Sequence, residues 1–407
     1  MRRPLVTLVM FCGLLMGISQ VSGAPTLTVT PLANPSGPLE SARQVSISRD
    51  VGLSVAQGGK NYWFFGDTYV PASASAKTGS LFVGGSTAAV SSAIIPGRSP
   101  TDLTEIKVGS LTPNVLPSQF LPPTTPAYIP GTNGVQCSQW PRGRTLRWIT
   151  GAATIPSSLA ASSILITYIG VCLEPARVTV QSFGFGVFST ATNSWALVRD
   201  VISPKPSGYE LPERFRFSYP TFNADGTVTF FSSRCIVGAV SFLCDKTVLH
   251  ATTMPATFVT MSNPASYNPT PVADLADGMN AALYAVGVMA SSAKTSTYYV
   301  VRLDDFAGLF HVFSATKIGG PYASVGTGTL PSCTGLPAGR FCYAFMVHPE
   351  LSPPGNLYVS YFTPGSRGSS DHISAALITL PGGTPPTSTT TSSTSSTTST
   401  TVRAPNR

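Results

Sequence analysis

Between Val45 and Leu380 the chain repeats one pattern, in which short apolar and β-branched runs alternate with turns that contain Gly or Pro. Such runs are typical of β-strands. The predicted strands form five groups: Val45–Ser48, Gly52–Ala56, Tyr62–Phe65 and Ser80–Val83; Leu146–Thr150, Ile164–Ile169, Val178–Phe188 and Trp195–Val198; Phe215–Phe222, Thr227–Ser232, Thr247–Ala251 and Phe258–Met261; Ala281–Met289, Thr297–Leu303 and Leu309–Ala315; Tyr343–Val347, Leu357–Phe362 and Ile373–Leu380.

Five groups of three or four strands predict an all-β fold, a five-bladed β-propeller in which each blade is a four-stranded sheet around a central channel. An early strand at Leu27–Pro31 would close the ring by joining the last blade. The rival interpretation is a pair of β-sandwiches, which the periodicity alone does not exclude, because no strict sequence repeat marks the blades.

The composition agrees with a β fold. Of 407 residues, 43% are hydrophobic and only 10% are charged, and there are 37 Gly and 36 Pro. So few charges argue against a helical bundle or a coiled coil, and the apolar content is too high for a disordered chain. The many Gly and Pro residues exclude long uninterrupted helices but suit short strands joined by turns.

The two ends of the chain differ from its middle. Arg2 and Arg3, an apolar run from Leu5 to Ile18 and small residues up to Ala24 have the order of a secretory signal peptide. The alternative, a retained membrane anchor, needs about 20 apolar residues, and this run is shorter. At the other end, Thr384 to Thr401 consists of Ser and Thr apart from two prolines, a composition that predicts a flexible stalk or an O-glycosylation target.

These boundaries divide the chain into a signal peptide (1–24), a single propeller domain (25–380) and a disordered Thr/Ser-rich tail (381–407). The net charge of +8 falls to +6 without Arg2 and Arg3. No Lys/Arg run with interleaved aromatic residues indicates nucleic acid, and no other stretch is apolar enough to span a membrane. We therefore expect a secreted or cell-wall-associated monomer.

Cysteine usage agrees with export. Once Cys12 leaves with the signal peptide, an even number remains, which predicts a disulfide set. Two pairs of cysteines are each separated by nine residues. If each of these pairs forms a local disulfide, the remaining two cysteines are left to join each other. A zinc site would want tighter pairs such as CxxC, and none exists. The cysteines are Cys137 and Cys172, Cys235 and Cys244, and Cys333 and Cys342.

Common catalytic motifs are absent. The chain has no GxSxG, HExxH or phosphate-binding GxxxxGK[ST] motif, and no GxGxxG that opens a helix. Its four histidines show no metal-ligand spacing, so we predict neither a metal nor a cofactor.

The most informative stretch is a predicted hairpin around Gly58-Gly59. A two-residue turn there pairs Leu53 with Phe64, and the same register places Asp50 opposite Asp67. Cross-strand partners have Cβ atoms about 4.5–5.5 Å apart, and like charges directly opposite are unfavourable unless something uses them. A bulge near the open end would instead turn Asp50 to the other face.

Two close carboxylates divide into one protonated and one ionised group. Glycoside hydrolysis needs this division, with carboxyl groups about 5–5.5 Å apart in retaining enzymes and about 6.5–9.5 Å apart in inverting ones. We expect Asp50 to act as nucleophile or base, and Asp67 as acid or as a group that tunes its neighbour. The structural alternative is that Asp67 caps a turn through Thr68 while Asp50 pairs with Arg49.

Other residues extend the candidate site. A third acid from another blade is expected from Glu174, Glu213, Asp277 and Glu350, with Glu350 first because His348-Pro349-Glu350 combines two ionisable groups. Candidate substrate-binding residues are Arg49, Trp140, Tyr219 and His348. For Trp140 and Tyr219, whose rings could stack on sugar faces, the alternative is packing in the core or at the rim.

Four motifs together resemble a known family. They are Arg49-Asp50-x-Gly52, Trp63-Phe64-Phe65-Gly66-Asp67-Thr68, Trp140-Pro141, and His348-Pro349-Glu350-Leu351 followed by Leu357-Tyr358-Val359-Ser360-Tyr361. They are similar to those of bacterial glycosidase-like five-bladed propellers that include endo-D-arabinanases acting on mycobacterial arabinan. The resemblance covers about Val45 to Leu380 and implies essential aspartates at Asp50 and Asp67. Val51 stands where the family pattern has a second glycine.

The leading hypothesis is a secreted, endo-acting glycoside hydrolase that cleaves arabinofuranosyl linkages in cell-envelope arabinan or arabinogalactan. The alternatives are a non-catalytic propeller that binds cell-wall glycan or a protein partner, and an exported propeller with a structural role only. Hydrolysis that depends on the two aspartates would distinguish the first from the others.

Overall fold

The computed structural model of the chain describes thirteen segments. The predicted signal peptide and most of the predicted tail lie outside them, as do Cys137, Trp140 and Cys244. The described residues are 24–37, 47–71, 80–108, 117–122, 144–174, 177–202, 215–237, 246–272, 287–290, 297–305, 307–337, 340–365 and 372–385.

The described strands form five four-stranded antiparallel sheets and one three-stranded sheet. The first two contain β3 (Leu53–Gln57), β4 (Lys60–Phe65), β7 (Thr87–Ser91) and β8 (Thr104–Glu105), and β9 (Arg144–Thr154), β10 (Ser163–Glu174), β11 (Arg177–Ser189) and β12 (Ser194–Ile202). The next two contain β13 (Phe215–Phe222), β14 (Thr227–Val237), β15 (Lys246–Pro255) and β16 (Thr270–Pro271), and β17 (Gly287–Ala290), β18 (Tyr298–Leu303), β19 (Leu309–Ala315) and β20 (Ala323–Thr329). The last contains β21 (Tyr343–Val347), β22 (Asn356–Thr363), β23 (His372–Thr379) and β1 (Thr28–Leu32), and the three-stranded sheet contains β2 (Ser48–Arg49), β5 (Thr68–Pro71) and β6 (Ser80–Gly84).

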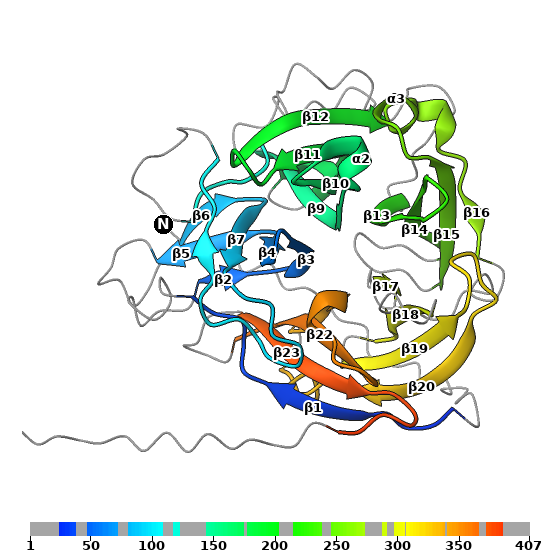
Figure 1. The fold of residues 1–407 in the computed structure, drawn as a ribbon. Helices are drawn as coiled ribbons and strands as arrows, with labels where there is room; N and C mark the ends of the chain where they lie inside the picture. Colours follow the sequence, from blue (N-terminus) through cyan, green and yellow to red (C-terminus); the bar gives the residue numbers. More distant parts are fainter. Residues whose placement is uncertain are drawn as a thin grey trace, which may run out of the picture.

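The five four-stranded sheets follow one another in a ring about a common centre (Figure 1). Each sheet has one inner strand, which lies next to this centre, and the chain enters the sheet from the preceding one through that strand. The inner strands are β3, β9, β13, β17 and β21. Inner strands of neighbouring sheets touch, because β9 lies against both β3 and β13, and β17 against both β13 and β21. This arrangement brings residues from all five sheets to one axis.

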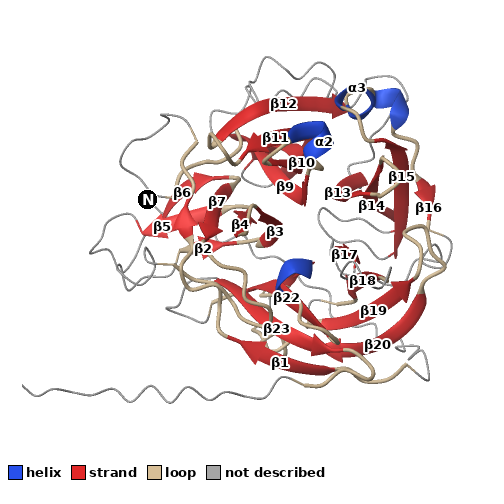
Figure 2. Cartoon of the chain, in the orientation of Figure 1, coloured by secondary structure: helices blue, strands red, loops and turns tan. Residues whose placement is uncertain are grey.

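The prediction of an all-β fold is confirmed, since strands dominate every part of the ring (Figure 2). Helices are few and short among the described residues, and none of them is long and apolar enough to cross a membrane. They are α2 (Ser157–Ala160), α3 (Phe258–Met261), η3 (Pro264–Ser266) and η5 (Pro349–Leu351).

The N-terminal strand joins the last sheet, as predicted. β1 pairs antiparallel with β23, with Thr28 opposite Thr379 and Leu32 opposite Ala375. Residues from the two ends of the folded chain therefore share one sheet, whose backbone hydrogen bonds hold the ring together where the chain begins and ends.

One predicted strand is wrong: Phe258–Met261 is the helix α3. Thr257 precedes it in an extended conformation, and its side chain accepts a hydrogen bond from the Thr260 backbone N–H, which is a helix N-cap. Helical spacing places Phe258 and Met261 on one face, and both pack into the same hydrophobic cluster. The cap and this packing outweigh the β-propensity that the sequence suggested.

The core lies between the sheets. Trp63 and Phe64 of β4 are both fully buried although they face opposite ways. Phe64 packs in one cluster with Ile166 of the second sheet, whereas Trp63 packs in another with Tyr358 of the last sheet. Each such side chain contributes about 1.5–3 kcal/mol through burial, so the first sheet is fixed on both faces.

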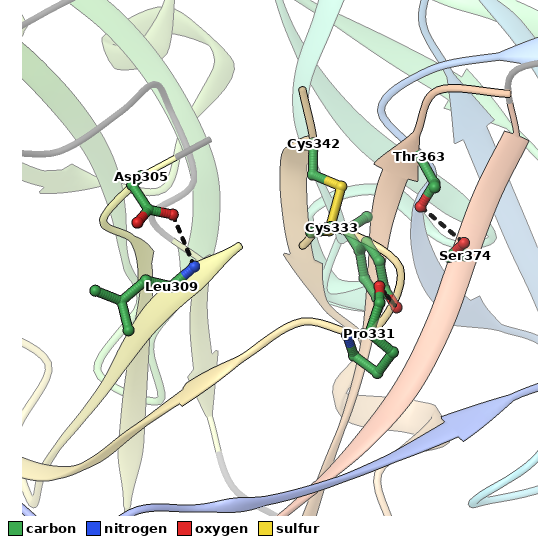
Figure 3. The surroundings of a disulfide bond; sticks show 8 residues. Asp305, Leu309, Pro331, Cys333, Cys342, Thr363 and Ser374 are labelled. Atoms are coloured by element: carbon green, nitrogen blue, oxygen red, sulfur yellow. Dashed lines mark hydrogen bonds between the residues drawn. A yellow bond between two sulfur atoms is a disulfide. The ribbon is translucent and has the colours of Figure 1, made fainter. Parts of the chain in front are cut away.

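One predicted disulfide is confirmed. Cys333 and Cys342 are joined, with their Cα atoms 5.7 Å apart, between β20 and the start of β21 (Figure 3). Cys172 is disulfide-bonded as well, but its partner is not described, nor is the side chain of Cys235. The proposed pairing of the other four cysteines stays a prediction.

Replacing both Cys333 and Cys342 by alanine should lower the free energy of unfolding by about 2.5 kcal/mol, because the bond closes a short loop in the unfolded chain. Urea titration followed by circular dichroism measures this difference. A change smaller than about 0.5 kcal/mol would show that the bond adds nothing to stability.

Candidate functional site

The hairpin predicted from Gly58-Gly59 is confirmed. β3 pairs with β4 in the expected register, with Leu53 opposite Phe64, and Gln57 opposite Lys60. The two glycines have φ angles of 58° and 77°, the left-handed region that a tight two-residue hairpin turn needs.

The same register continues beyond the hairpin to the two aspartates. Arg49 lies opposite Thr68 where β2 pairs with β5. Next to this pair, the Asp50 backbone N–H donates to the Asp67 carbonyl (3.3 Å), and the Gly66 N–H donates to the Asp50 carbonyl (2.9 Å). Asp50 and Asp67 therefore stand opposite each other, as predicted.

The two residues after Asp50 are in an unusual conformation. Val51 and Gly52 both have φ 69°, which is uncommon for any residue with a side chain and strained for a β-branched one. A glycine at position 51 would adopt this backbone conformation without that strain. The regular ladder is interrupted here, since Asp50 bonds both Gly66 and Asp67.

Each carboxylate accepts a hydrogen bond from a neutral donor on a different sheet. The Tyr343 hydroxyl at the start of β21 donates to Asp50 Oδ2 (2.8 Å). The Trp148 indole N–H on β9 donates to Asp67 Oδ1 (2.8 Å). Residues of three sheets thus meet at the aspartate pair, and neutral donors of this kind stabilise an ionised carboxylate without neutralising it.

Glycines make room for this arrangement. A Cβ at Gly66 would lie 2.1 Å from Asp50 Oδ1, so no other residue leaves space for that carboxylate. A Cβ at Gly85 would lie 3.2 Å from Trp148 Cδ1 and 2.8 Å from Leu146 Cβ. Both glycines allow the close approach of a side chain that the site uses.

Arg49 has a different partner from the one that the structural alternative gave it. Its guanidinium is 4% exposed, pairs with the Glu105 carboxylate and lies 4.4 Å from the centre of the Phe65 ring. Burial raises the pKa of Glu105, and the charge of Arg49 opposes that rise. Arg49 of β2 is thus buried against Glu105 of β8, and its predicted contact with substrate stays a prediction.

Glu350 and His348 lie together with Ser54 of β3. The Ser54 hydroxyl is in hydrogen-bond contact with Glu350 Oε1 and lies 2.5 Å from His348 Nδ1. His348 is fully buried and stacks on Trp63, with ring centres 4.7 Å apart. Burial raises the pKa of Glu350 and lowers that of His348 to about 3, so both are driven towards their uncharged forms.

Glu350, Tyr219 and Ser54 line one cavity of about 920 Å³. His348 does not line it and is enclosed behind Ser54. The Tyr219 hydroxyl donates to Met346 Sδ (2.5 Å), and burial raises its pKa. The structure therefore brings two predicted site residues, Glu350 and Tyr219, to the same cavity.

This cavity and the aspartates lie at different levels of the ring. The aspartates are bonded to Tyr343, the first residue of β21, and to Trp148, in the first half of β9. The cavity is lined instead by Val347, the last residue of β21, and by Thr154, the last of β9. The described hydrogen bond of Glu350 is to Ser54, so its role as a third acid beside Asp50 and Asp67 stays a prediction.

Sequence reasoning missed Tyr343, Trp148 and Ser54. Tyr343 and Trp148 lie in strands that were predicted. Their contacts with the aspartates form only because the ring brings different sheets together. Only the strand register offered a signal for Ser54: it lies opposite Trp63, on which His348 stacks.

Among the described residues, no group of three or more His, Cys, Asp or Glu side chains is arranged to hold a metal ion. No protein-family model matches the chain, and no curated protein is similar to it in sequence.

Several solved structures are similar in fold. A GH43_1 enzyme from Xanthomonas citri complexed with xylose has a TM-score of 0.47 and 10% identity over 86% of this chain and 90% of that one. A family 117 glycoside hydrolase from Zobellia galactanivorans has a TM-score of 0.48 and 9% identity, over 87% of this chain and 90% of its own. A thermostable family-43 glycoside hydrolase has a TM-score of 0.44 and 12% identity, over 86% and 92%. The resemblance to endo-D-arabinanases stays a prediction.

Replacing Gly66 by alanine should displace the Asp50 carboxylate, because the new Cβ would occupy its position. We expect any activity that uses Asp50 to fall at least about a hundredfold. The matched control is Gly319→Ala, where an added Cβ meets nothing within 4 Å. Equal activity in the two variants, both checked for folding by circular dichroism, would show that the position of Asp50 does not matter.

Proposed function

We propose that this protein is a secreted glycoside hydrolase whose catalytic groups are Asp50 and Asp67. The observation that carries the proposal is that these residues face each other beyond the open end of the β3–β4 hairpin, with each carboxylate bonded to a neutral donor. Like charges that face each other on neighbouring strands are unfavourable unless something uses them. Gly66 makes room for the Asp50 carboxylate. This arrangement favours a chemical role for the two aspartates over a structural one.

The opposed aspartates suit the two roles of glycoside hydrolysis. Facing positions on two neighbouring strands allow both carboxyl groups to reach one glycosidic bond. In the proposed reaction Asp50 acts on the anomeric carbon as nucleophile or through a water that it deprotonates. Asp67 protonates the leaving oxygen or tunes Asp50. Tyr343 and Trp148 hold the carboxylates in place.

For the substrate we propose arabinofuranosyl linkages in cell-envelope arabinan, cleaved by endo action. The support is the resemblance of the four sequence motifs to a family that includes endo-D-arabinanases. Within this proposal the five four-stranded sheets are the blades of a five-bladed propeller. Export through the N-terminal signal peptide agrees with the disulfide bonds at Cys172 and between Cys333 and Cys342, since such bonds persist in oxidising compartments.

The Asp50→Asn and Asp67→Asn variants should each release oligosaccharides from arabinogalactan about 10²–10⁴-fold more slowly than the parent, because each removes one acid–base group. Release is measured by chromatography of reaction products. The control is Asp225→Asn, which alters an exposed turn carboxylate that bonds Thr227. If the parent releases nothing while it and both variants bind the polysaccharide equally, the protein is a glycan-binding propeller instead.

Tyr343→Phe and Trp148→Phe each remove one donor to an aspartate and should lower the hydrolysis rate about tenfold, with little change in thermal stability. Tyr361→Phe is a matched control, because its hydroxyl donates to the Pro331 carbonyl (2.9 Å) away from the aspartates. A hydrolysis rate in Tyr343→Phe equal to that of the control would exclude a role for the donor to Asp50.

A further inference from the structure

The cavity at the ends of the inner strands has features of a binding site of its own. All five four-stranded sheets contribute to its wall, and its volume of about 920 Å³ falls in the range of small-molecule sites. Lining residues that the argument uses are Ser54, Thr154, Tyr219, Phe222, Tyr299 and Glu350.

The wall is almost without charge. Glu350 is the only acidic or basic side chain among the described residues that line the cavity. Three aromatic side chains, Tyr219, Phe222 and Tyr299, are partly exposed there. Flat apolar faces beside a few polar groups are the surface that a sugar ring needs, because it presents C–H faces and hydroxyl edges.

Behind Glu350 a chain of hydrogen bonds runs into the protein. His348 Nε2 lies 2.8 Å from the Ser360 hydroxyl, which itself donates to the Gly52 carbonyl (2.7 Å). Since Ser360 has only one proton to donate, His348 Nε2 must carry the hydrogen in its bond with Ser360. Nδ1 of the same ring lies 2.5 Å from the Ser54 hydroxyl oxygen.

Ser54 connects Glu350 to this buried histidine. The Ser54 hydroxyl donates its single proton to Glu350 Oε1. Burial raises the pKa of Glu350 and lowers that of His348, so it opposes a charge on either group. The second carboxyl oxygen of Glu350 is a further hydrogen-bond acceptor at the cavity wall.

The backbone on the opposite wall is strained. Tyr219 has φ 50°, and the pairing of β13 with β14 shifts between Ser218 and Thr221, which is a β-bulge that redirects the side chain. Gly151 permits this, since a Cβ there would lie 2.3 Å from the Tyr219 backbone N. Strain and bulges of this kind are concentrated at functional sites.

We propose that this cavity is a second ligand site, separate from the aspartate pair, that takes an uncharged glycan segment. Glu350, held in place by Ser54, accepts a hydrogen bond from a ligand hydroxyl, and Tyr219 supplies an aromatic face for a sugar ring. Because the described lining has no other acidic or basic side chain, it favours uncharged sugars over charged ones. The site binds without any chemistry at Asp50 or Asp67.

Binding is measured by calorimetry in an Asp50→Asn/Asp67→Asn background, so that hydrolysis at the aspartates plays no part. The probes are a neutral arabino-oligosaccharide, a cationic chitosan oligosaccharide and an anionic oligogalacturonate. We expect the neutral probe to bind most tightly. Adding Glu350→Gln to this background should change the affinity for the neutral probe less than about twofold, because the amide still accepts and donates hydrogen bonds. Adding Glu350→Ala should weaken binding of the same probe about tenfold, because the acceptor is lost.

Two results would overturn the proposal: equal weakening by Glu350→Gln and Glu350→Ala together with preference for the cationic probe, or no effect of Glu350→Ala. A measurement on the unsubstituted chain does not depend on variant folding. The ¹⁵N signals of His348, assigned by their loss in His348→Gln, should show a neutral Nε2–H ring that shifts when the neutral probe is added. An imidazolium signal, or no shift at saturation, would contradict the proposed site.

Discussion

The pairing of β3 with β4 is the constraint on which both candidate sites depend. Because side chains alternate along a strand, a slip of one residue would reverse every side chain of the hairpin. The register that buries Trp63 and Phe64 on opposite faces is also the one that sets Asp50 against Asp67. Burial of two large aromatic side chains thus fixes a geometry that the two carboxylates alone would oppose.

Irregular positions on the inner strands then adapt this scaffold. Pairing shifts occur in β9 next to Gly151, in β13 at Tyr219 and in β21 at Ala344, where φ is 53°. A regular strand at these places would keep the inner side chains in strict alternation. The extra residue re-aims a side chain towards the axis, and glycines provide the space, as Gly151 does for Tyr219.

Local patterns were sufficient for many of the strands and for the register of the first hairpin, although β7 and β20 were not predicted. The hairpin followed from Gly58-Gly59, since a tight turn has few backbone solutions, and the strand at Leu309–Ala315 was predicted to the residue. The helix Phe258–Met261 was missed because its Thr257 cap looks like any other strand residue in sequence. Contacts such as Tyr343 with Asp50 join residues almost 300 positions apart, and only closure of the ring creates them. Capping and closure therefore set the limit of what the sequence could predict.

The same hairpin connects the two ends of the axis. Ser54 bonds Glu350 at the cavity and lies opposite Trp63, on which His348 stacks. The hydrogen-bond chain that starts at Glu350 ends on the Gly52 carbonyl, two residues after Asp50. Gly52 in turn packs closely against Ile373, since a Cβ added at Gly52 would lie only 3.0 Å from the Ile373 side chain. A shift of the chain at Gly52 would therefore disturb both the hydrogen bonds behind Glu350 and the placement of Asp50, so the left-handed conformation at Val51 and Gly52 is a requirement shared by both ends.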